Sequence, residues 1–358
     1  MARVATAAPP PPTATVHAVS EFPTTVPDTP GAAAADAELE SARRKTGITS
    51  TQPLDLRNSF ICSSNVAPAF LNSCATATLF PESFIKDKPK FKYIIPNESI
   101  GSLKGKTNAL ANAIKISCGE IILTTDADCI VSPEWVKTHA SYYSDNVGFV
   151  GGFTTQQDQN SFAGMQAIDF VYLLTVAAGS LNFGKPLSCI GNNMSYRKSV
   201  YKKIGGYEGL HFSVTEDFNL LMAIHDLKEY KIIYPLDVGA LVTSKACPDW
   251  KTLYWQKKRW GVGGMKSDLF GYSVMVWGYI VHAAMVLLPF FFSMTGLYLS
   301  IFKICIDYFF VKPVFNKLNL RMKFSHFIAF EIYFIIYVLV LPFIVLPNRE
   351  VKWKGRTF

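Results

Sequence analysis

Hydrophobic and polar positions divide the chain into a proline-rich beginning, a middle of short apolar runs and a strongly apolar end. In the middle, apolar runs at residues 90–95, 121–125 and 147–153 predict strands, because each is short and bounded by turn residues. Residues 160–181 form a longer apolar run that predicts a helix. This alternation of strand and helix patterns predicts an α/β domain over residues 90–248.

The C-terminal part of the chain has the pattern of a membrane region. Residues 269–302 contain no Asp, Glu, Lys or Arg. A single span needs about 20 apolar residues, so this run predicts two helices with a turn near residues 293–296. A third apolar segment, residues 328–346, carries one acidic residue, Glu331. A buried core helix would explain one such segment, but together they predict a membrane region of about three segments over residues 270–348.

The first 89 residues give a weaker pattern. Ala, Pro and Thr dominate residues 1–55, and such a segment buries too little apolar surface to offset the entropy of ordering it. We therefore predict that residues 1–55 are disordered, and they contain no apolar run that resembles a secretory signal or a membrane anchor. Residues 56–89 have short apolar stretches without a sustained period, so their structure is ambiguous.

Composition and charge favour a membrane protein over a nucleic-acid-binding one. Only 17% of residues are charged, and the mean hydropathy is +0.19. The net charge is +8, from 35 basic and 27 acidic residues. Lys and Arg beside membrane segments pair with anionic lipid, and no nucleic-acid-binding motif accompanies them. Membrane lipids are therefore expected partners and nucleic acid is not. The seven cysteines lack C-x-x-C spacing and indicate neither a zinc site nor a disulfide framework.

Two carboxylates follow the strand predicted at residues 121–125. Asp126 and Asp128 fall beyond its carboxyl end, which is where ligands bind in open α/β sheets. Paired carboxylates are the oxygen ligands that Mg²⁺ or Mn²⁺ prefer, usually shared with substrate phosphates. Taken alone, the D-A-D triplet fits an ordinary turn at the end of a strand equally well.

Two glycine-containing segments each have a ligand-binding interpretation and a plainer one. Lys106 follows Gly105 where a loop meets a helix predicted over residues 103–114. Positive charge and free amides there suit a phosphate or diphosphate, although a solvated basic helix start fits equally well. The spacing is not that of a Walker A loop. The G-N-N segment at residues 191–193 suits either a chain passing close to a polar ligand or simple turn chemistry.

Two acidic residues begin a further predicted helix. Thr215 suits the N-cap, and Glu216 and Asp217 fall in the first turn, where the helix dipole favours negative charge. Capping alone would explain these residues. An Asp held there beside apolar Phe218 also suits a general base that deprotonates a hydroxyl within hydrogen-bond reach.

An amphipathic helix is predicted over residues 249–268, just before the first membrane segment. Gln256, Arg259 and Trp260 share one face of it, because they lie at i, i+3 and i+4. Arg offers a planar fork for phosphate oxygens, while Trp and Gln suit stacking on and hydrogen bonding to a sugar. The alternative is an interfacial helix with Trp and Lys at the lipid headgroups, and the two interpretations are compatible.

Taken together, these motifs resemble family 2 glycosyltransferases, the membrane-integrated GT-A enzymes that include cellulose, chitin, hyaluronan and ceramide-glucosyl synthases. The matching motifs follow in the family's order: G-K-T-N-A-L at 105–110, D-A-D at 126–128, G-N-N at 191–193, T-E-D at 215–217 and Q-K-K-R-W at 256–260. The resemblance is close over about residues 90–270. Its specificity comes from the order of D-x-D, T-E-D and Q-x-x-R-W ahead of a membrane segment.

The resemblance implies a GT-A fold, an α/β sheet flanked by helices, with C-terminal transmembrane helices. It implies that Asp126 and Asp128 contact the diphosphate of a nucleotide-sugar donor, Asp128 through Mg²⁺ or Mn²⁺, with Lys106 near the nucleotide. Asp217 would be the catalytic base of an inverting, single-displacement attack. The residues that would hold the diphosphate and the acceptor are Glu216, Gln256, Arg259 and Trp260.

The chain departs from the family pattern at its beginning. The family opens with an apolar strand followed by an acidic loop, then a second strand ending in Asp, and this half binds uracil and ribose. Residues 1–89 show no such pattern, and the nearest candidate, residues 60–62, is short and runs into Ser63-Ser64-Asn65. The sequence therefore predicts a GT-A sheet that is incomplete in its N-terminal half, through truncation, a misjoined reading frame or a replaced exon.

The predicted function is inverting transfer of a sugar from a nucleotide sugar, expected to be UDP-linked, to a lipid or glycan acceptor at the membrane surface. The alternative is a catalytically inactive or truncated relative that acts as a binding or scaffold subunit. We expect an integral membrane protein with its catalytic domain on the cytosolic face. Three full spans would place the basic tail, residues 349–358, on the opposite face, unless a segment within residues 290–346 is interfacial.

Overall fold

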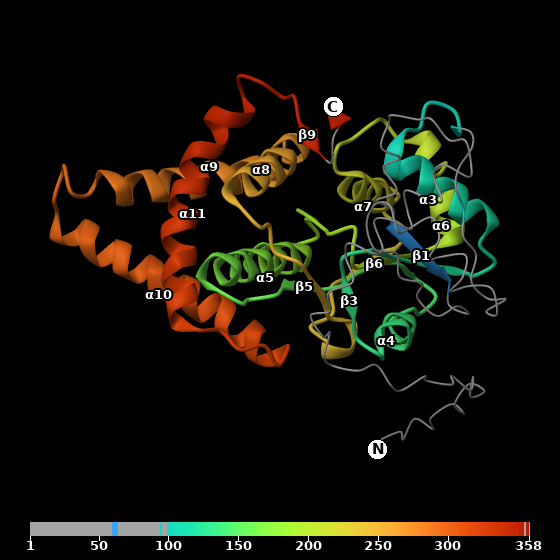
Figure 1. Cartoon of the computed structure of the whole chain (residues 1–358), viewed down its shortest axis with the longest axis horizontal. Helices are drawn as coiled ribbons and strands as arrows, with labels where there is room; N and C mark the ends of the chain where they lie inside the picture. The colour runs from blue at the N-terminus through green and yellow to red at the C-terminus, as the bar shows by residue number, and fades with distance from the viewer. Residues whose placement is uncertain (1–58, 64–93, 95–98, 354–355, 358) are drawn as a thin grey trace, which may run out of the picture. The chain divides into compact units, whose positions relative to one another are not determined.

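A computed structural model describes residues 59–63, 94, 99–353 and 356–357 (Figure 1). The segment predicted to be disordered, residues 1–55, lies outside the described residues, and so does most of the ambiguous segment that follows it. The strand predicted at residues 90–95 also falls outside them except for Ile94, which is not in a strand.

The larger sheet has five strands in the order β1-β2-β6-β4-β7. Their bounds are β1 Ser59–Ser63, β2 Ile121–Asp126, β4 Val147–Gly151, β6 Met194–Arg197 and β7 Lys231–Ile233. All pairs are antiparallel except β4 with β7, which is parallel. The first five residues of β2 are buried, and the strand ends at Asp126, so its position and its end were correctly predicted.

The first strand corrects a prediction. Residues 60–62 were judged too short for a strand, yet the chain over Ser59–Ser63 pairs antiparallel with β2, with Ile61 opposite Thr124. Three apolar residues are enough to form a strand here because the edge of β2, which has a long apolar run, is available for pairing. The two backbones satisfy each other's hydrogen bonds in that register.

A smaller sheet and several helices complete the α/β unit. The smaller sheet has the order β3-β8-β5, with β3 Ile130–Val131, β8 Val242–Ser244 and β5 Thr154–Gln156. The helices of this part are α3 Gly105–Ile116, α4 Trp135–Ser141, α5 Ser161–Leu181, α6 Lys198–Lys203 and α7 Glu216–Asp226, with short 3-10 turns at Tyr207–Gly209 and Val238–Ala240. Helices α3, α6 and α7 pack on the larger sheet through one apolar cluster that includes Ile114, Phe149 and Leu220. The expectation of an α/β fold with helices flanking the sheet is confirmed.

Asn193 ties the two sheets and α4 together. Its Nδ2 donates to the backbone oxygens of Phe153 and Ala240, at 2.7 and 2.9 Å, and its Oδ1 accepts from Trp135 Nε1 at 2.9 Å. A Cβ added at Gly152 would lie 2.4 Å from the Asn193 amide, so glycine is required there for this close approach. Asn193 is therefore a fully buried structural residue, which favours the plainer interpretation for this part of the G-N-N segment.

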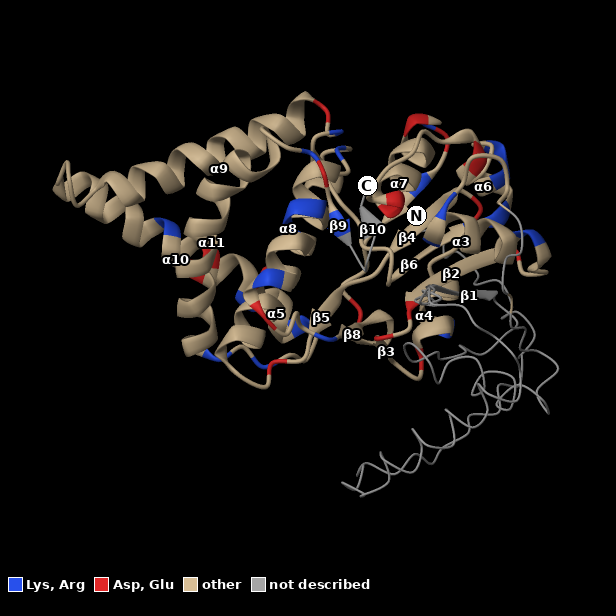
Figure 2. Ribbon diagram, turned by 45° about the horizontal axis from the view of Figure 1, so that its top comes forward, with Lys and Arg blue, Asp and Glu red and all other residues tan. Residues whose placement is uncertain are grey.

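Within the part of the chain that the structure describes, four helices are long and apolar enough to cross a membrane: α5, α9 Leu269–Leu287, α10 Met294–Lys317 and α11 Phe324–Val345. Helix α5 is 61% buried over its most apolar window, against 11% for α9 and for α10, because α5 packs against α10 and α11 as well as against β5 of the α/β unit. Helices α9 and α10 form a hairpin that extends away from it, and α9 carries no charged residue (Figure 2). The predicted turn near 293–296 lies slightly earlier, between Leu287 and Met294.

Helix α10 continues beyond the uncharged run from which it was predicted, and α11 begins four residues earlier than expected. The extension of α10 includes Lys303 and Asp307, and Lys303 is paired with acidic residues of both helices. Lys303 Nζ lies 2.7 Å from Asp307 Oδ2 and 2.8 Å from Glu331 Oε2, which joins α10 to α11. A buried charge is tolerated when an opposite charge satisfies it, so these residues do not interrupt the apolar helices.

Helix α11 lies against α5 (Figure 1), its start contacts the α/β unit and its end contacts the helix Trp250–Gly264. Lys323, at its start, lies 3.8 Å from the carboxylate of Asp158. At its end, Val345 packs on Gly261 of α8 (Trp250–Gly264), where a Cβ would come within 2.8 Å of it. The chain then forms β9 Lys352–Trp353, paired with β10 Arg356–Thr357. β9 lies beside α8, so the tail is not on the far side of the helices as three full spans would require.

Candidate active site

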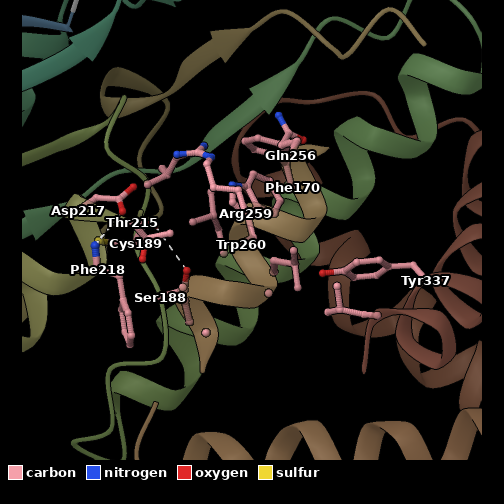
Figure 3. Close-up of a pocket in the computed structure, with 18 of the residues that line it drawn as sticks. Phe170, Ser188, Cys189, Thr215, Asp217, Phe218, Gln256, Arg259, Trp260 and Tyr337 are labelled. Carbon is pink, nitrogen blue, oxygen red and sulfur yellow. Dashed lines mark hydrogen bonds between the residues drawn. The ribbon is translucent and has the colours of Figure 1, made fainter. Parts of the chain in front are cut away.

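One cavity of about 1250 Å³ lies between the α/β unit and helices α8, α9 and α11 (Figure 3). All eight candidate residues line it: Lys106, Asp126, Asp128, Glu216, Asp217, Gln256, Arg259 and Trp260. They come from the start of α3, the end of β2, the start of α7 and one face of α8, segments up to 154 residues apart in the sequence. The geometry thus brings the predicted residues together, while their individual roles remain predictions.

Lys106 connects the end of β2 to the start of α7. Its Nζ lies 3.1 Å from Asp126 Oδ1 and 2.8 Å from Glu216 Oε1. Burial alone would lower the pKa of the ammonium, but the charges of Asp126, Glu216 and Asp217 raise it well above its ordinary value. Lys106 is therefore a permanently charged group inside the cavity, and the solvated-helix-start interpretation does not describe it.

Asp126 and Asp128 differ in their surroundings. Asp126 is paired with Lys106, while Asp128 lies exposed in the turn after the strand, where the Cys129 thiol, 3.6 Å away, donates to it. The described residues contain no group of three or more His, Cys, Asp or Glu side chains placed to hold a metal. A two-carboxylate arrangement of this kind fits a hard divalent cation that takes its other ligands from water and substrate phosphates.

Asp217 is held by two backbone amides. Gly191 donates to its Oδ2 at 2.7 Å, and Phe218 donates to its Oδ1 at 2.8 Å. Burial of the carboxyl and the adjacent Glu216 charge raise its pKa to about 6, against the opposing effect of Lys106 and Arg259. Asp217 is thus ionised at neutral pH but close enough to titration to accept a proton, the property that a general base needs.

The pKa of the adjacent carboxyl, that of Glu216, is shifted in the opposite direction. Burial acts to raise the pKa of Glu216, but the charges of Lys106 and Arg259 and the hydrogen bond from Lys106 hold it below its ordinary value. Two adjacent carboxyls therefore have separated pKa values, which is the pattern by which proteins assign different roles to like groups.

Thr215 occupies the N-cap as predicted, but its hydroxyl contacts Ser213 at 3.3 Å and does not cap the helix.

Helix α8 presents the Q-x-x-R-W face to the cavity. It begins at the N-cap Asp249, whose Oδ1 accepts from Thr252 N at 2.7 Å. Gln256 Oε1 is buried and has no hydrogen-bond partner among the residues that the structure describes. Since an unpaired buried acceptor is costly, this oxygen is available to a ligand donor. The Arg259 guanidinium lies 3.4 Å from the Val214 carbonyl, beside the start of α7.

A buried ion pair fixes the rotation of this helix. Lys257 of α8 bonds to Asp169 of α5, and both side chains are almost completely buried. The Lys257 ammonium also lies 4.2 Å from the ring centroid of Trp260, a cation–π distance, and Phe170 contacts the same ring edge-on at 5.0 Å. These contacts set the orientation of Trp260, which lies beside Arg259 in Figure 3.

Several cavity residues were not predicted. Gly191 belongs to a motif that we noticed, but its hydrogen bond to Asp217 depends on tertiary structure. Tyr337 of α11 and Lys352 of β9 also line the cavity. Both lie more than 75 residues beyond the last predicted motif in an apolar or short basic context, so no local pattern marks them as site residues.

Comparison with known proteins assigns the family. Residues 121–346, well over half of the chain, match the sequence model of the family described as Glycosyl transferase family group 2. The chain belongs to this family of glycosyltransferases. The family membership supports sugar transfer as the class of reaction, and it confirms the resemblance inferred from the order of the motifs. A membrane-integrated subtype is not decided by it.

Individual relatives are distant and mostly match over part of their length. The chain is 30% identical over 116 residues to an N-acetylglucosaminyltransferase of Sinorhizobium fredii, covering 31% of this chain and 27% of that protein. It is 26% identical over 133 residues to an N-acetylglucosaminyltransferase of Neorhizobium galegae, covering 36% of this chain and 30% of that protein. It is 24% identical over 302 residues to the probable glycosyltransferase YdaM of Bacillus subtilis, covering 70% and 69% of the two chains.

Proposed function

We propose that this glycosyltransferase is an inverting enzyme that moves a sugar from a nucleotide sugar to an acceptor hydroxyl at the membrane surface. The observation that carries the proposal is the position of Asp217, held by two amides in the cavity that Lys106 and Arg259 also line. A base with a pKa of about 6 beside two permanent cations is the combination that proton removal and departure of a diphosphate require.

In this mechanism Asp217 removes the proton from the acceptor hydroxyl. The hydroxyl oxygen attacks the anomeric carbon of the donor sugar while the bond from that carbon to the diphosphate oxygen breaks. A single displacement of this kind inverts the anomeric configuration. The leaving diphosphate takes up the bonding electrons, and the Lys106 ammonium and the Arg259 guanidinium offset the charge that develops on it.

A divalent cation fits the end of β2. Asp128 has no strong partner of its own among the described residues, whereas Asp126 is paired with Lys106, so Asp128 would be the direct ligand of Mg²⁺ or Mn²⁺. When bound, the cation would supply positive charge to the donor diphosphate. Asp126 would then act on the donor through Lys106, which it holds in place.

The donor that we propose is a UDP-linked sugar, and the acceptor is a lipid or a glycan. The names of the rhizobial relatives make UDP-N-acetylglucosamine the first donor to test. The catalytic unit is proposed to face the cytosol, where nucleotide sugars are available, with the apolar helices beside it in the membrane.

The test uses the full chain in lipid nanodiscs, with release of UDP from UDP-N-acetylglucosamine as the readout and Mn²⁺ or Mg²⁺ present. We expect Asp217→Asn to lower turnover by roughly 10²–10⁴-fold while UDP binding is kept, because only the proton acceptor is lost. Asp226→Asn is the matched control, since Asp226 is the exposed last residue of the same helix. Absence of both UDP binding and turnover across several UDP-sugars would reject the enzyme and favour a binding or scaffold role.

A further inference from the structure

The cavity has two chemically different ends. The charged residues described above lie at one end, on α3, β2 and α7. The other end lies between α5, α9 and α11, three of the helices long and apolar enough to cross a membrane. The whole cavity, about 1250 Å³, exceeds the roughly 300–1,000 Å³ of ordinary small-molecule sites. Its size leaves room for more than the donor.

Helix α9 contributes one continuous face to the second end. Its lining residues are Gly271, Val274, Met275, Gly278, Tyr279 and His282. Successive members are alternately three residues and one residue apart, which places them all on one side of the helix. Although this side faces the protein, Val274 and Met275 remain 39% and 43% exposed. These two positions of the α9 face are therefore turned inward but not packed, while Gly271 and His282 at its two ends are buried.

Helices α11 and α5 supply the opposite walls. The α11 residues are Phe334, Tyr337, Val338, Leu341 and Pro342, again on one helical face, and the α5 residues include Phe170, Leu173, Leu174 and Ala177. Figure 3 shows Asp217 and Tyr337 at opposite sides of the view, with Arg259 and Trp260 between them. The charged and apolar ends are thus continuous, and Trp260 lies at their junction.

The polar side chains at the apolar end are few: His282, Tyr279, Tyr337 and Tyr172, whose hydroxyl donates to Asp307. His282 Nδ1 lies 2.6 Å from the Gly278 carbonyl, so in the neutral ring its N–H is used by the helix backbone. A glycan would need a hydrogen-bond partner for most of its hydroxyls, and leaving them unpaired against apolar walls is costly. A hydrocarbon chain has no such requirement, and it gains free energy when apolar walls replace water around it.

We propose that the slot between α5, α9 and α11 holds the hydrocarbon chain of the acceptor, which is a membrane lipid with a hydroxyl-bearing headgroup. The chain lies along the faces of α9 and α11, and the headgroup passes Trp260 to reach Asp217. This inference rests on the proposed function, because it takes Asp217 as the base. It narrows the acceptor from a lipid or a glycan to a lipid.

Gly278 provides the test. A Cβ added there meets no atom within 4 Å, so Gly278→Phe places a ring in the slot without displacing the backbone. Gly179 of α5 has equally open surroundings but does not line the cavity, so Gly179→Phe is the matched control. Val274→Trp fills the same slot from an exposed position and guards against a folding defect that is specific to Gly278.

The probes are a diacylglycerol and a polyprenol, each with a photoactivatable diazirine in its hydrocarbon chain, in phosphatidylcholine nanodiscs without donor. For at least one probe, labelling of Met275 or Val338 is expected to saturate as the probe fraction rises. It should fall at least about tenfold in Gly278→Phe and Val274→Trp and stay unchanged in Gly179→Phe. Labelling of Trp277, 65% exposed on the outer face, should rise without saturating.

Labelling of the slot that does not saturate with either probe, or that both slot-filling variants leave unchanged, would overturn the proposal. UDP binding, measured separately by calorimetry, distinguishes this outcome from failure of the proposed function. Saturable labelling without UDP binding would reject the enzyme and keep the hydrocarbon site. UDP binding and turnover without saturable labelling would keep the enzyme and return the acceptor to a glycan.

Discussion

Gly191 donates its backbone N–H to Asp217 Oδ2 at 2.7 Å, across 26 positions of sequence. A Cβ at Gly191 would lie 3.2 Å from that oxygen and 3.3 Å from Lys106 Nζ, so the glycine lets the chain pass between the base and the cation. Because the hydrogen bond holds one carboxylate oxygen and Phe218 N holds the other, the direction in which Asp217 accepts a proton is set by the backbone.

The pH dependence of activity should follow Asp217. Its pKa is raised to about 6 by burial and by Glu216, so the base is protonated and inactive at lower pH. We expect kcat/KM to fall about tenfold per pH unit below about pH 6 and to level off above it. The same raised pKa means that this carboxyl's contribution to stability decreases as the pH rises from about 4 to 6. A profile of UDP release between pH 4.5 and 8 measures the first effect, and a flat profile would exclude Asp217 as the base.

Removing Lys106 should shift this profile. The Lys106 charge lowers the pKa of Asp217, so in Lys106→Met that pKa rises and the acidic limb moves to higher pH. Loss of a charged contact of about 1.5–3 kcal/mol to the diphosphate should also weaken donor binding by roughly 10–100-fold. Lys104→Met, an exposed lysine two residues earlier, should change neither quantity. An unshifted acidic limb in Lys106→Met would show that the two groups are not coupled.

The effect of a divalent cation on UDP binding should differ between variants of the two carboxylates at the end of β2. We expect Asp128→Asn to weaken UDP binding at least about tenfold in Mn²⁺ and to leave binding in EDTA unchanged, because it removes a metal ligand. Asp126→Asn should weaken binding in both conditions, because it loosens Lys106. Calorimetry with UDP in each buffer makes the comparison, and equal losses in EDTA for both variants would contradict the assignment of the metal to Asp128.

The buried pair between Asp169 and Lys257 should dominate the stability of the joint between α5 and α8. Asp169→Asn leaves a buried ammonium without its counter-charge and should destabilise the protein by about 3–5 kcal/mol. The double variant Asp169→Leu with Lys257→Met should cost much less, because no charge is left buried. Thermal unfolding in nanodiscs measures the stability of each variant. Lys251→Met, at an exposed position of the same helix, is the control. A double variant as unstable as Asp169→Asn would show that the charge itself is not the cause.

The local parts of the site were visible in the sequence because each has its own pattern. The strand that ends at Asp126, the acids in the first turn of α7 and the shared face of Gln256, Arg259 and Trp260 follow from periodicity and capping alone. Ordering the motifs then identified the family. What periodicity could not supply was the pairing of Lys106 with Glu216, since that contact is set by how α3 and α7 pack on the sheet.

Other features could not be predicted from the sequence for a different reason. The strand Ser59–Ser63 has too few apolar residues to be recognised alone and depends on the edge of β2. The inward face of α9 looks like any membrane helix, because lipid and a lipid-binding slot select the same side chains. Asn193 looked like a turn residue, whereas its side-chain hydrogen bonds reach partners that are at least 40 positions away.

The chain returns to α8 after three apolar helices, and this return limits how many of the three can cross a membrane. Lys352 lines the cavity that Asp217 lines, and its ammonium lies 5.9 Å from the ring centroid of Trp255. A chain that leaves α8 and comes back beside it crosses a bilayer an even number of times, yet three helices lie between. We expect α11 to be the helix that does not cross, because its start contacts Asp158 of the α/β unit and its end contacts Gly261 of α8. We then expect α9 and α10 to cross the bilayer and return, and an epitope placed at residues 348–350 should be accessible from the same face as the active site.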